Sequence, residues 1–329
     1  MRTVLVTGGA GYIGSHMTAL LNEQGYRVIV ADNLCTGHAR AVAGIPLRVG
    51  DLRDGAFLNR LFQEEPIDSV IDFTAYSQVS ESMRDPLKYY ENNLPCMISL
   101  LHAMREHEVK HLVFSSSAAV YGVPEKQPVE ESDLTAPVNP YGAGKLAVEE
   151  LLRWCGQAYG LRYAALRYFN AAGADLHADI GEDHTPETHL IPLALKTALG
   201  QRSKIEIFGN DYPTPDGTCV RDYVHVRDLA QAHLLALEYL ERGGESGAFN
   251  LGSGTGYSVG EILDAARRVT GRDIPVFSGS RRAGDPPVLI ASIDKAGRAL
   301  GWAPSRGIEE ILEDAWRWHS THPDGYGID

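Results

Sequence analysis

The segment TGGAGYIGSH restricts the fold of this chain more than any other feature of the sequence. It joins a short apolar run, Thr3–Thr7, to a helical pattern over residues 12–24. Within it, Gly8, Gly11 and Gly14 have the spacing GxxGxxG. Glycine permits a tight turn, and the absence of Cβ atoms lets an anion approach the amides at the start of the helix. We therefore predict a βαβ unit that opens with an anion-binding turn.

Short apolar runs alternate with helical patterns throughout the first half of the chain. This alternation indicates right-handed βαβ units, and hence an α/β fold with a doubly wound parallel sheet of the Rossmann type. We expect strands at Thr3–Thr7, Arg27–Ala31, Leu47–Val49, Ser69–Phe73, His111–Ser115 and Arg162–Leu166, and helices over 12–24, 55–64, 86–107 and 140–158.

Asp32, a carboxylate at the end of the second expected strand, indicates that the anion bound by the glycine turn is the pyrophosphate of NAD. A carboxylate at this place accepts hydrogen bonds from the ribose hydroxyls of NAD and repels the extra phosphate of NADP. The alternative is a glycine turn with a purely structural role. Asp51, which ends the third expected strand, is placed to touch the adenine or, alternatively, to cap the next helix.

The pattern becomes irregular after about residue 170. The polar, acidic stretch ADLHADIGEDHTPETH is expected to be a loop, and after it we expect a helix near 190–199, a strand near 205–208 and a helix near 227–241. We predict an NAD-binding Rossmann domain over residues 1–170, to which segments near 221–250 return. Residues 171–329 are expected to form mainly a smaller, mixed α/β lobe that binds the substrate.

Composition excludes several classes of function. The chain has 329 residues, of which 44% are hydrophobic, and can therefore bury a large core. Its net charge of -13 argues against non-specific binding to nucleic acid or to an anionic membrane. The four cysteines have no metal-ligand spacing, so we predict reduced thiols and no metal site. No signal-peptide pattern or membrane-spanning apolar run is present, and a soluble cytoplasmic protein is expected.

The sequence NPYGAGKLAVEE places Tyr141 and Lys145 four residues apart, and therefore on one face of a predicted helix. Asn139 is expected to be the N-cap of this helix and Pro140 its first residue. With 15 tyrosines and 7 lysines in the chain, roughly 0.3 such pairs arise by chance, so the pair indicates a function only together with other evidence. The serine run 115–117 is such evidence, because these serines end a predicted strand at the edge where ligands bind in this type of sheet.

A tyrosine next to a lysine and NAD is suited to taking the proton from a secondary alcohol. The pKa of free tyrosine is about 10, which is too high for an efficient base at neutral pH. The lysine ammonium and the positively charged nicotinamide both favour the phenolate. Lys145 could also hold the nicotinamide ribose hydroxyls, and Gly142 and Gly144 are expected to leave room beside the helix. A single serine more often only caps a turn, but here one serine is a candidate donor to a sugar hydroxyl.

Together these motifs resemble the extended short-chain dehydrogenase/reductase family. The resemblance covers nearly the whole chain and is closest to the members that epimerise UDP-glucose and UDP-galactose at C4. It rests on TGGAGYIGSH, DNLCTGH, FSSSAAVYG, NPYGAGK, LRYFNAAGA, IFGNDYPTPDGTCVRDYVHV, FNLGSG and RRAGDPP. It implies NAD-dependent 4-epimerisation of a UDP-hexose through a transient 4-keto sugar. It also implies a homodimer formed by the helices near 86–107 and 140–158.

The resemblance assigns site residues as well. The catalytic residues would be Tyr141, Lys145 and Ser117. The residues in contact with NAD would be these three together with Gly8, Gly11, Tyr12, Ile13, Gly14, Asp32, Asn33, Leu34, Cys35, Thr36, Gly37, Asp51, Leu52, Phe73, Thr74, Ala75, Tyr76, Ser77, Asn92 and Phe169. The residues in contact with the UDP-sugar would be Ser117, Tyr141, Asn170, His189, Leu190, Phe208, Arg221, Arg282 and Asp285.

Three positions depart from the best-known bacterial pattern of the family. Ser77 stands where a lysine is often found, and His189 replaces an asparagine that precedes Leu190. His189 either faces the substrate phosphates or only packs. Leu289 replaces a tyrosine that often closes the sugar pocket, so we hypothesise that an N-acetylated substrate, UDP-N-acetylglucosamine, is also accepted.

Two rival functions and one structural alternative stay open. A nucleotide-sugar 4,6-dehydratase would carry an Asp–Glu pair where this chain has Ala118 and Ala119. A non-catalytic NAD-binding module would not need the tyrosine and the lysine.

Arg221 and Arg282 suit a diphosphate because a guanidinium binds phosphate oxygens bidentately. The alternative for each is a structural ion pair with Asp222 or Asp285.

Overall fold

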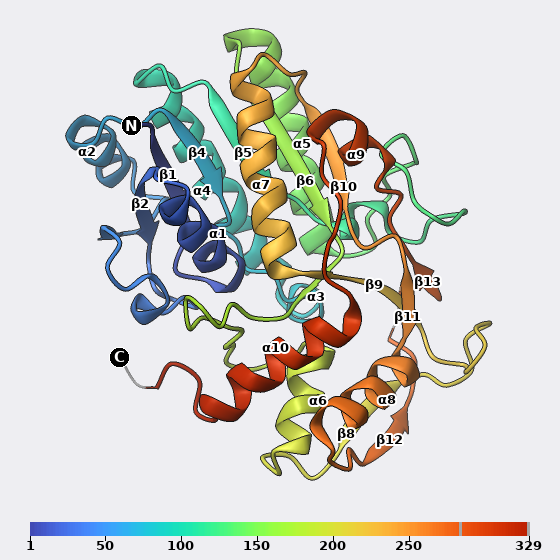
Figure 1. The fold of residues 1–329 in the computed structure, drawn as a ribbon. Helices are drawn as coiled ribbons and strands as arrows, with labels where there is room; N and C mark the ends of the chain where they lie inside the picture. Colours follow the sequence, from blue (N-terminus) through green and yellow to red (C-terminus); the bar gives the residue numbers. More distant parts are fainter. Residues whose placement is uncertain (283–284, 328–329) are drawn as a thin grey trace.

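A seven-stranded parallel sheet forms the larger part of the computed structural model, which describes residues 1–282 and 285–327 (Figure 1). The strand order is β10-β6-β5-β4-β1-β2-β3, so the order of the chain reverses between β1 and β4. The strands are β1 (Thr3–Thr7), β2 (Arg27–Asp32), β3 (Leu47–Val49), β4 (Ser69–Asp72), β5 (His111–Ser115), β6 (Arg162–Tyr168) and β10 (Gly247–Leu251). The predicted doubly wound sheet is confirmed, and the ends of its first six strands lie within two residues of their predicted positions.

Helices cover both faces of this sheet (Figure 1). One face carries α1 (Tyr12–Glu23), α7 (Val226–Glu241) and α9 (Asp294–Leu300), and the other carries α2 (Gly55–Glu64), α4 (Pro86–Glu106) and α5 (Pro140–Tyr159). Along β1, Val4 and Val6 pack with α1 and α7, whereas Leu5 packs with α2, α4 and α5. Burial on both faces explains why the strands are continuous apolar runs instead of alternating ones.

A smaller lobe lies beyond the carboxyl ends of the large sheet (Figure 1). It contains a sheet of β7 (Asn170–Ala172), β9 (Val220–His225), β11 (Gly256–Ser258) and β13 (Val288–Leu289), and a pair formed by β8 (Ile205–Phe208) and β12 (Val276–Gly279). Helices α6 (Leu190–Ala198), α8 (Val259–Thr270) and α10 (Ile308–Thr321) bury their apolar sides against one another. Short helical segments are α3 (Val79–Ser82) and the 3₁₀ turns η1 (Ala39–Val42) and η2 (Ala118–Tyr121). None of the helices within the described ranges is long and apolar enough to cross a membrane.

The chain passes between the two lobes more than once. After the small lobe begins at β7, α7 and β10 lie in the large lobe, whereas β9 belongs to the small sheet. A buried carboxylate, Asp228 of α7, joins the lobes at this crossing. It accepts hydrogen bonds from the backbone amides of Ser305 (2.9 Å) and Arg306 (3.0 Å) and from the Ser305 hydroxyl (2.8 Å). The Arg306 guanidinium also pairs with it, so the segment that leads into α10 is held against α7.

We expect Asp228→Ala to lower the free energy of unfolding by about 2–4 kcal/mol, because four polar groups lose a buried charged acceptor. Urea denaturation followed by circular dichroism measures the change. The matched control is Asp264→Ala, which removes an exposed carboxylate paired with Arg267 at 2.7 Å. The control is expected to cost less than about 0.5 kcal/mol. Equal effects of the two substitutions would contradict the role given to Asp228.

Candidate active site

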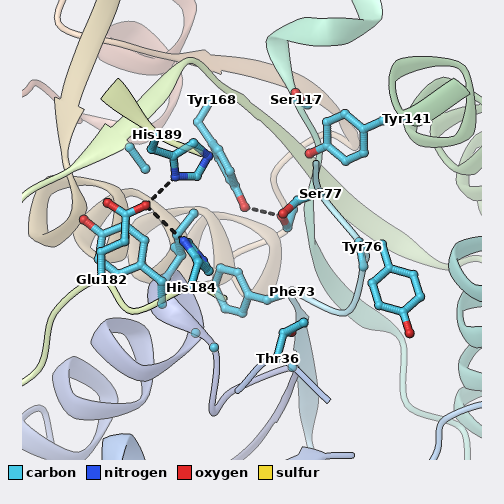
Figure 2. Close-up of a pocket in the computed structure, with 18 of the residues that line it drawn as sticks. Thr36, Phe73, Tyr76, Ser77, Ser117, Tyr141, Tyr168, Glu182, His184 and His189 are labelled. Carbon is cyan, nitrogen blue, oxygen red and sulfur yellow. Dashed lines mark hydrogen bonds and ion pairs between the residues drawn. The ribbon is translucent and has the colours of Figure 1, made fainter. Parts of the chain in front are cut away.

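A deep pocket opens at the carboxyl ends of β1, β4 and β5, where the strand order reverses. This is the place where open α/β sheets bind their ligands. Of the predicted site residues, the following line it: Gly8, Gly11, Tyr12, Ile13, Gly14, Asp32, Asn33, Cys35, Thr36, Phe73, Thr74, Ala75, Tyr76, Ser77, Asn92, Ser117, Tyr141, Lys145, Phe169, Asn170, His189 and Leu190. Figure 2 shows Tyr141 and Ser117 on one side of the pocket, and Glu182, His184 and His189 on the opposite side.

The glycine turn brings α1 close to the sheet. Gly8 has a φ of +65°, and a Cβ atom there would lie 2.8 Å from the backbone of Phe73 and Thr74. A Cβ atom on Gly14 would lie 2.4 Å from the carbonyl oxygen of Gly8. Gly11 caps α1 without a side-chain hydrogen bond, and the first turn carries no acidic residue. The first amides of α1 are therefore free of a competing carboxylate and suit a phosphate group.

Asp32 lies at the end of β2, in the pocket wall. Its carboxylate accepts hydrogen bonds from the backbone amides of Leu34 (2.8 Å) and Ala10 (3.0 Å). Burial raises the pKa of Asp32, and these hydrogen bonds oppose the shift. Each carboxylate oxygen has a second lone pair that can accept from a ribose hydroxyl. The free helix N-terminus, the glycines and this carboxylate together fit NAD.

Four of the predicted NAD contacts, Leu34, Gly37, Asp51 and Leu52, do not line this pocket. The carboxylate of Asp51 pairs with the Arg53 guanidinium at 2.5 Å. It does not cap α2, because the N-cap of that helix is Asp54, which accepts from the Ala56 amide at 2.9 Å. The capping alternative for Asp51 is therefore wrong.

The three serines that follow β5 have different partners. Ser115 makes a short hydrogen bond with the Tyr168 hydroxyl, and the Ser116 hydroxyl donates to Glu149 at 2.5 Å. Ser117 accepts from the Ala119 amide at 3.1 Å, and its side chain lies near enough to Tyr141 to oppose the rise in the pKa of that tyrosine. Among these serines, Ser117 is thus the one that opposes the rise in the pKa of Tyr141.

Helix α5 holds Tyr141 and Lys145 on one buried side, as the sequence predicts. It begins after Asn139, whose side chain accepts from the Gly142 amide at 2.8 Å. The two glycines of its first turns differ in their roles. A Cβ atom on Gly142 would lie 2.5 Å from the carbonyl oxygen of Ala119, so this glycine allows close packing against η2. A Cβ atom on Gly144 would meet no described atom within 4 Å, so here there is open space.

Lys145 is buried and its ammonium donates to the carbonyl oxygen of Ser115 at 2.6 Å. It lies 5.9 Å from the centroid of the Tyr141 ring and 4.8 Å from that of Phe114. Burial lowers the pKa of Lys145 to about 8, against the opposing charges of Asp72 and Glu149. Burial also raises the pKa of Tyr141, and the hydrogen bond with Ser117 opposes that shift. The sequence analysis expected Lys145 to lower the pKa of Tyr141. In the structure the effect of burial, which raises this pKa, is larger, because the phenol is desolvated and the lysine donates to a carbonyl oxygen.

The predicted substrate contacts fall into two groups. Ser117, Tyr141, Asn170, His189 and Leu190 line the pocket, whereas Phe208, Arg221, Arg282 and Asp285 lie outside the pocket lining.

Arg221 donates to Asp285 at 2.7 Å and to the carbonyl oxygen of Val220 at 2.8 Å. The predicted structural ion pair with Asp285 is therefore present at Arg221. The Arg282 guanidinium lies over the Phe208 ring, 3.9 Å from its centroid. The remainder of the RRAGDPP motif includes Ala283 and Gly284, which lie outside the described residues.

Several pocket residues were missed by the sequence analysis. They are Val79, Tyr168, Ala171, Ala172, Glu182, His184, Ile191, Pro192 and Tyr223, whereas Ser115, which also lines the pocket, belongs to the predicted serine run. Most are apolar or belong to strand ends, which no local pattern distinguishes from ordinary core residues. For Glu182 and His184 a signal existed, because the loop GEDHTPETH concentrates histidines and acids.

Comparisons with known proteins agree with this geometry. Residues 4–252 match the model of the NAD dependent epimerase/dehydratase family. A UDP-glucose 4-epimerase of Halalkalibacterium halodurans is 54% identical over 99% of this chain and 98% of its own length. A crystal structure of a UDP-glucose 4-epimerase superposes with a TM-score of 0.97 at 51% identity, covering 99% of this chain and 100% of that one. Another from Bifidobacterium longum, in complex with NAD+ and UDP, has a TM-score of 0.94 at 38% identity and covers 99% and 100%.

We expect Gly14→Ala to reduce the NAD content of the purified protein by at least about tenfold, because the added methyl group collides with the backbone of the glycine turn. The matched control is Gly55→Ala at the first residue of α2, where a Cβ atom meets no described atom within 4 Å. Absorbance and enzymatic assay of NAD released by denaturation measure both variants. Full NAD content in Gly14→Ala would contradict the close approach of α1 to the turn.

Proposed function

The chain belongs to the NAD dependent epimerase/dehydratase family, and from this premise we propose that it interconverts a UDP-hexose and its 4-epimer, UDP-glucose and UDP-galactose. The observation that carries the proposal is that Tyr141 and Ser117 lie together on one side of the pocket, with a buried lysine and the glycine turn in the same lining (Figure 2). The reaction is an isomerisation with NAD as its cofactor.

We assign the binding of NAD to three parts of the pocket. The first amides of α1 would hold the pyrophosphate, and Asp32 would accept hydrogen bonds from the adenosine ribose. Lys145, fixed by the Ser115 carbonyl, would hold the nicotinamide ribose hydroxyls. Bound there, NAD would supply the acceptor, and afterwards the donor, of the hydride exchanged at C4 of the hexose. Because oxidation and reduction cancel, the cofactor need not leave.

Tyr141 would move the proton of the 4-hydroxyl. Its phenolic oxygen takes the proton as the alcohol is oxidised and gives it back when the ketone is reduced. Burial alone holds the Tyr141 pKa above its usual value, so the base depends on hydrogen bonding by Ser117 and on nearby positive charge. A pKa of about 8 leaves Lys145 charged at neutral pH, and it supplies part of that charge. Ser117 would also donate to the sugar hydroxyl and orient it.

The small lobe would anchor the UDP group. Arg221 and Arg282 are the proposed contacts of the diphosphate, with Asn170, Leu190 and Phe208 around the nucleotide. The ion pair with Asp285 fixes the direction of the Arg221 guanidinium, which still has unused N–H donors. Firm anchoring is part of the chemistry, since the 4-keto sugar must turn over in the pocket without leaving. In this arrangement residues 1–170 with α7 and β10 hold NAD, and the rest of the chain mainly holds the UDP-sugar.

The rival functions are less well supported. Elimination of water by a 4,6-dehydratase needs an acid and a base next to the active hydroxyls, but η2 presents Ala118 and Ala119 there. A module that only binds NAD has no use for a tyrosine and a lysine that both face the pocket.

We further propose a cytoplasmic homodimer that serves galactose metabolism. Helices α4 and α5 expose apolar side chains, among them Ile98 and Trp154. A hollow between the two helices is lined by further apolar groups, including Leu101, Leu151 and Tyr159. A second copy of this face would bury these groups as a four-helix bundle.

Substitution of Tyr141 by phenylalanine tests the proposed function. We expect turnover of UDP-galactose to fall by at least about 10³-fold while NAD stays bound, because the base is lost and the ring is kept. The matched control on the same helix is Tyr159→Phe, which removes a hydroxyl at the other end of α5, outside the pocket lining. Turnover of Tyr141→Phe at the rate of the control would remove the tyrosine from the mechanism.

Leu289 is the residue that we expect to decide whether an N-acetylated UDP-sugar is accepted. It is partly buried and packs against an apolar cluster whose member Phe169 lines the pocket. We expect measurable epimerisation of UDP-N-acetylglucosamine, since a leucine leaves more room than a tyrosine. Leu289→Tyr should lower kcat/KM for that substrate by about 10–100-fold and leave UDP-glucose within about threefold. The control, Leu134→Tyr, alters an exposed leucine. An enzyme active on UDP-glucose with no turnover of the N-acetyl sugar would refute the hypothesis.

A further inference from the structure

Two histidines and a glutamate line the pocket wall opposite Tyr141 (Figure 2), and a second glutamate lies close to them. They are Glu182, His184, Glu187 and His189, all in the loop between β7 and α6. One ligand atom from each of the four lies within 4.8 Å of all the others. The proposed epimerisation uses none of these groups as acid, base or hydride carrier, so the cluster calls for a separate explanation.

The spacing of the donor atoms resembles that of a tetrahedral metal site. For metal–ligand bonds of about 2.0–2.1 Å, tetrahedral geometry separates the ligand atoms by about 3.3 Å. Nδ1 of His184 lies 3.2 Å from Oε1 of Glu182 and 3.6 Å from Oε2 of Glu187. Nδ1 of His189 is in direct contact with Oε1 of Glu182 and 3.9 Å from Oε1 of Glu187. Small side-chain adjustments would place all four donors around one ion.

Glu187 provides an independent sign of a missing ligand. Its side chain is only 5% exposed. Oε1 is fixed by the backbone amides of Thr188 (2.6 Å) and His189 (2.8 Å), which set the direction of the carboxylate. Oε2 is buried and has no hydrogen-bond partner among the described residues. Nδ1 of His184, 3.6 Å away, is too far for a hydrogen bond, and a buried carboxylate oxygen without one costs free energy that a cation in the cluster would remove.

We propose that Glu182, His184, Glu187 and His189 form a binding site for a divalent transition-metal ion, with Zn2+ as the ion that best suits two imidazole and two carboxylate donors. The two carboxylates balance the charge of the ion. The side chains of His189 and His184 are 49% and 25% exposed, so the site has an open side toward the pocket. An ion there would stand beside the cavity that takes the anionic cofactor and substrate. The sequence analysis predicted no metal site because it considered only the spacing of the cysteines, and this cluster contains none.

The test measures metal content, independently of epimerase activity. Protein that retains its NAD is treated with EDTA, desalted, equilibrated with ZnCl2 at a small excess, and desalted again. We expect elemental analysis to find about one Zn2+ per chain, and little uptake from MgCl2, because Mg2+ prefers an octahedral set of oxygens. Zn2+ should also raise the midpoint of thermal unfolding by at least about 3 °C, and EDTA should reverse the rise.

Two variants and a control assign the binding to these residues. Glu187→Gln keeps the size of the side chain, and its amide oxygen can still accept from the two backbone amides that bind Oε1. It is expected to lose at least about tenfold in Zn2+ affinity, and His184→Asn likewise. The control His322→Asn removes a histidine that pairs with Asp179 at 3.4 Å outside the cluster, and it should bind Zn2+ like the wild type. Circular dichroism confirms that each variant is folded.

The proposal is overturned by either of two results. One is wild-type protein that takes up less than about 0.1 Zn2+ per chain, in which case the cluster is a metal-free network of ion pairs. The other is equal uptake by the wild type and the folded Glu187→Gln and His184→Asn variants, because the ion would then bind elsewhere.

Discussion

The contact between the Lys145 ammonium and the Ser115 carbonyl, 2.6 Å long, is the interaction on which the site depends. It joins the first turns of α5 to the end of β5, and so fixes the tyrosine of α5 beside Ser117. An ammonium in a buried position loses its hydration, which lowers its pKa to about 8. The carbonyl, together with the charges of Asp72 and Glu149, replaces part of that hydration and keeps a cation in the pocket at neutral pH.

A second buried network of hydrogen bonds and an ion pair holds α5 in place relative to the sheet. Glu149, on the same helix as Lys145, receives the Ser116 hydroxyl and the Arg167 guanidinium, each at 2.5 Å. Arg167 also donates to the Tyr121 hydroxyl at 2.9 Å, and so connects α5, β6 and η2. Because the members of the network are mutually hydrogen-bonded, the charges of Glu149 and Arg167 compensate each other. The network therefore holds together the elements that carry Tyr141, Lys145 and Ser117 on one side of the pocket. The loop 182–189, on the opposite side, belongs to the small lobe.

The division into two lobes explains how one chain can hold both a dinucleotide and a nucleotide sugar. The large sheet offers the glycine turn, Asp32 and α5 at its carboxyl edge, and the small lobe closes over that edge. Asp228 and the segment before α10 hold the lobes together at a distance from the pocket. The loop 182–189 can therefore approach the N-terminus of α1, where the edge of the Tyr12 ring faces His184 with ring centroids 6.2 Å apart.

The sequence by itself determined the alternation of strands and helices, the glycine turn, and the tyrosine and lysine on one side of α5 with Asn139 as cap. These features depend on residues that are close together in the chain, through periodicity, capping and backbone freedom. Tertiary structure alone decided which serine influences the pKa of Tyr141, that Asp51 pairs with Arg53 while Asp54 caps α2, that Gly142 packs against η2, and that Arg221 pairs with Asp285. It also decided that the acidic loop turns its histidines and glutamates toward one another. Most of these outcomes depend on contacts between segments distant in sequence, and all of them on side-chain directions that local patterns do not encode.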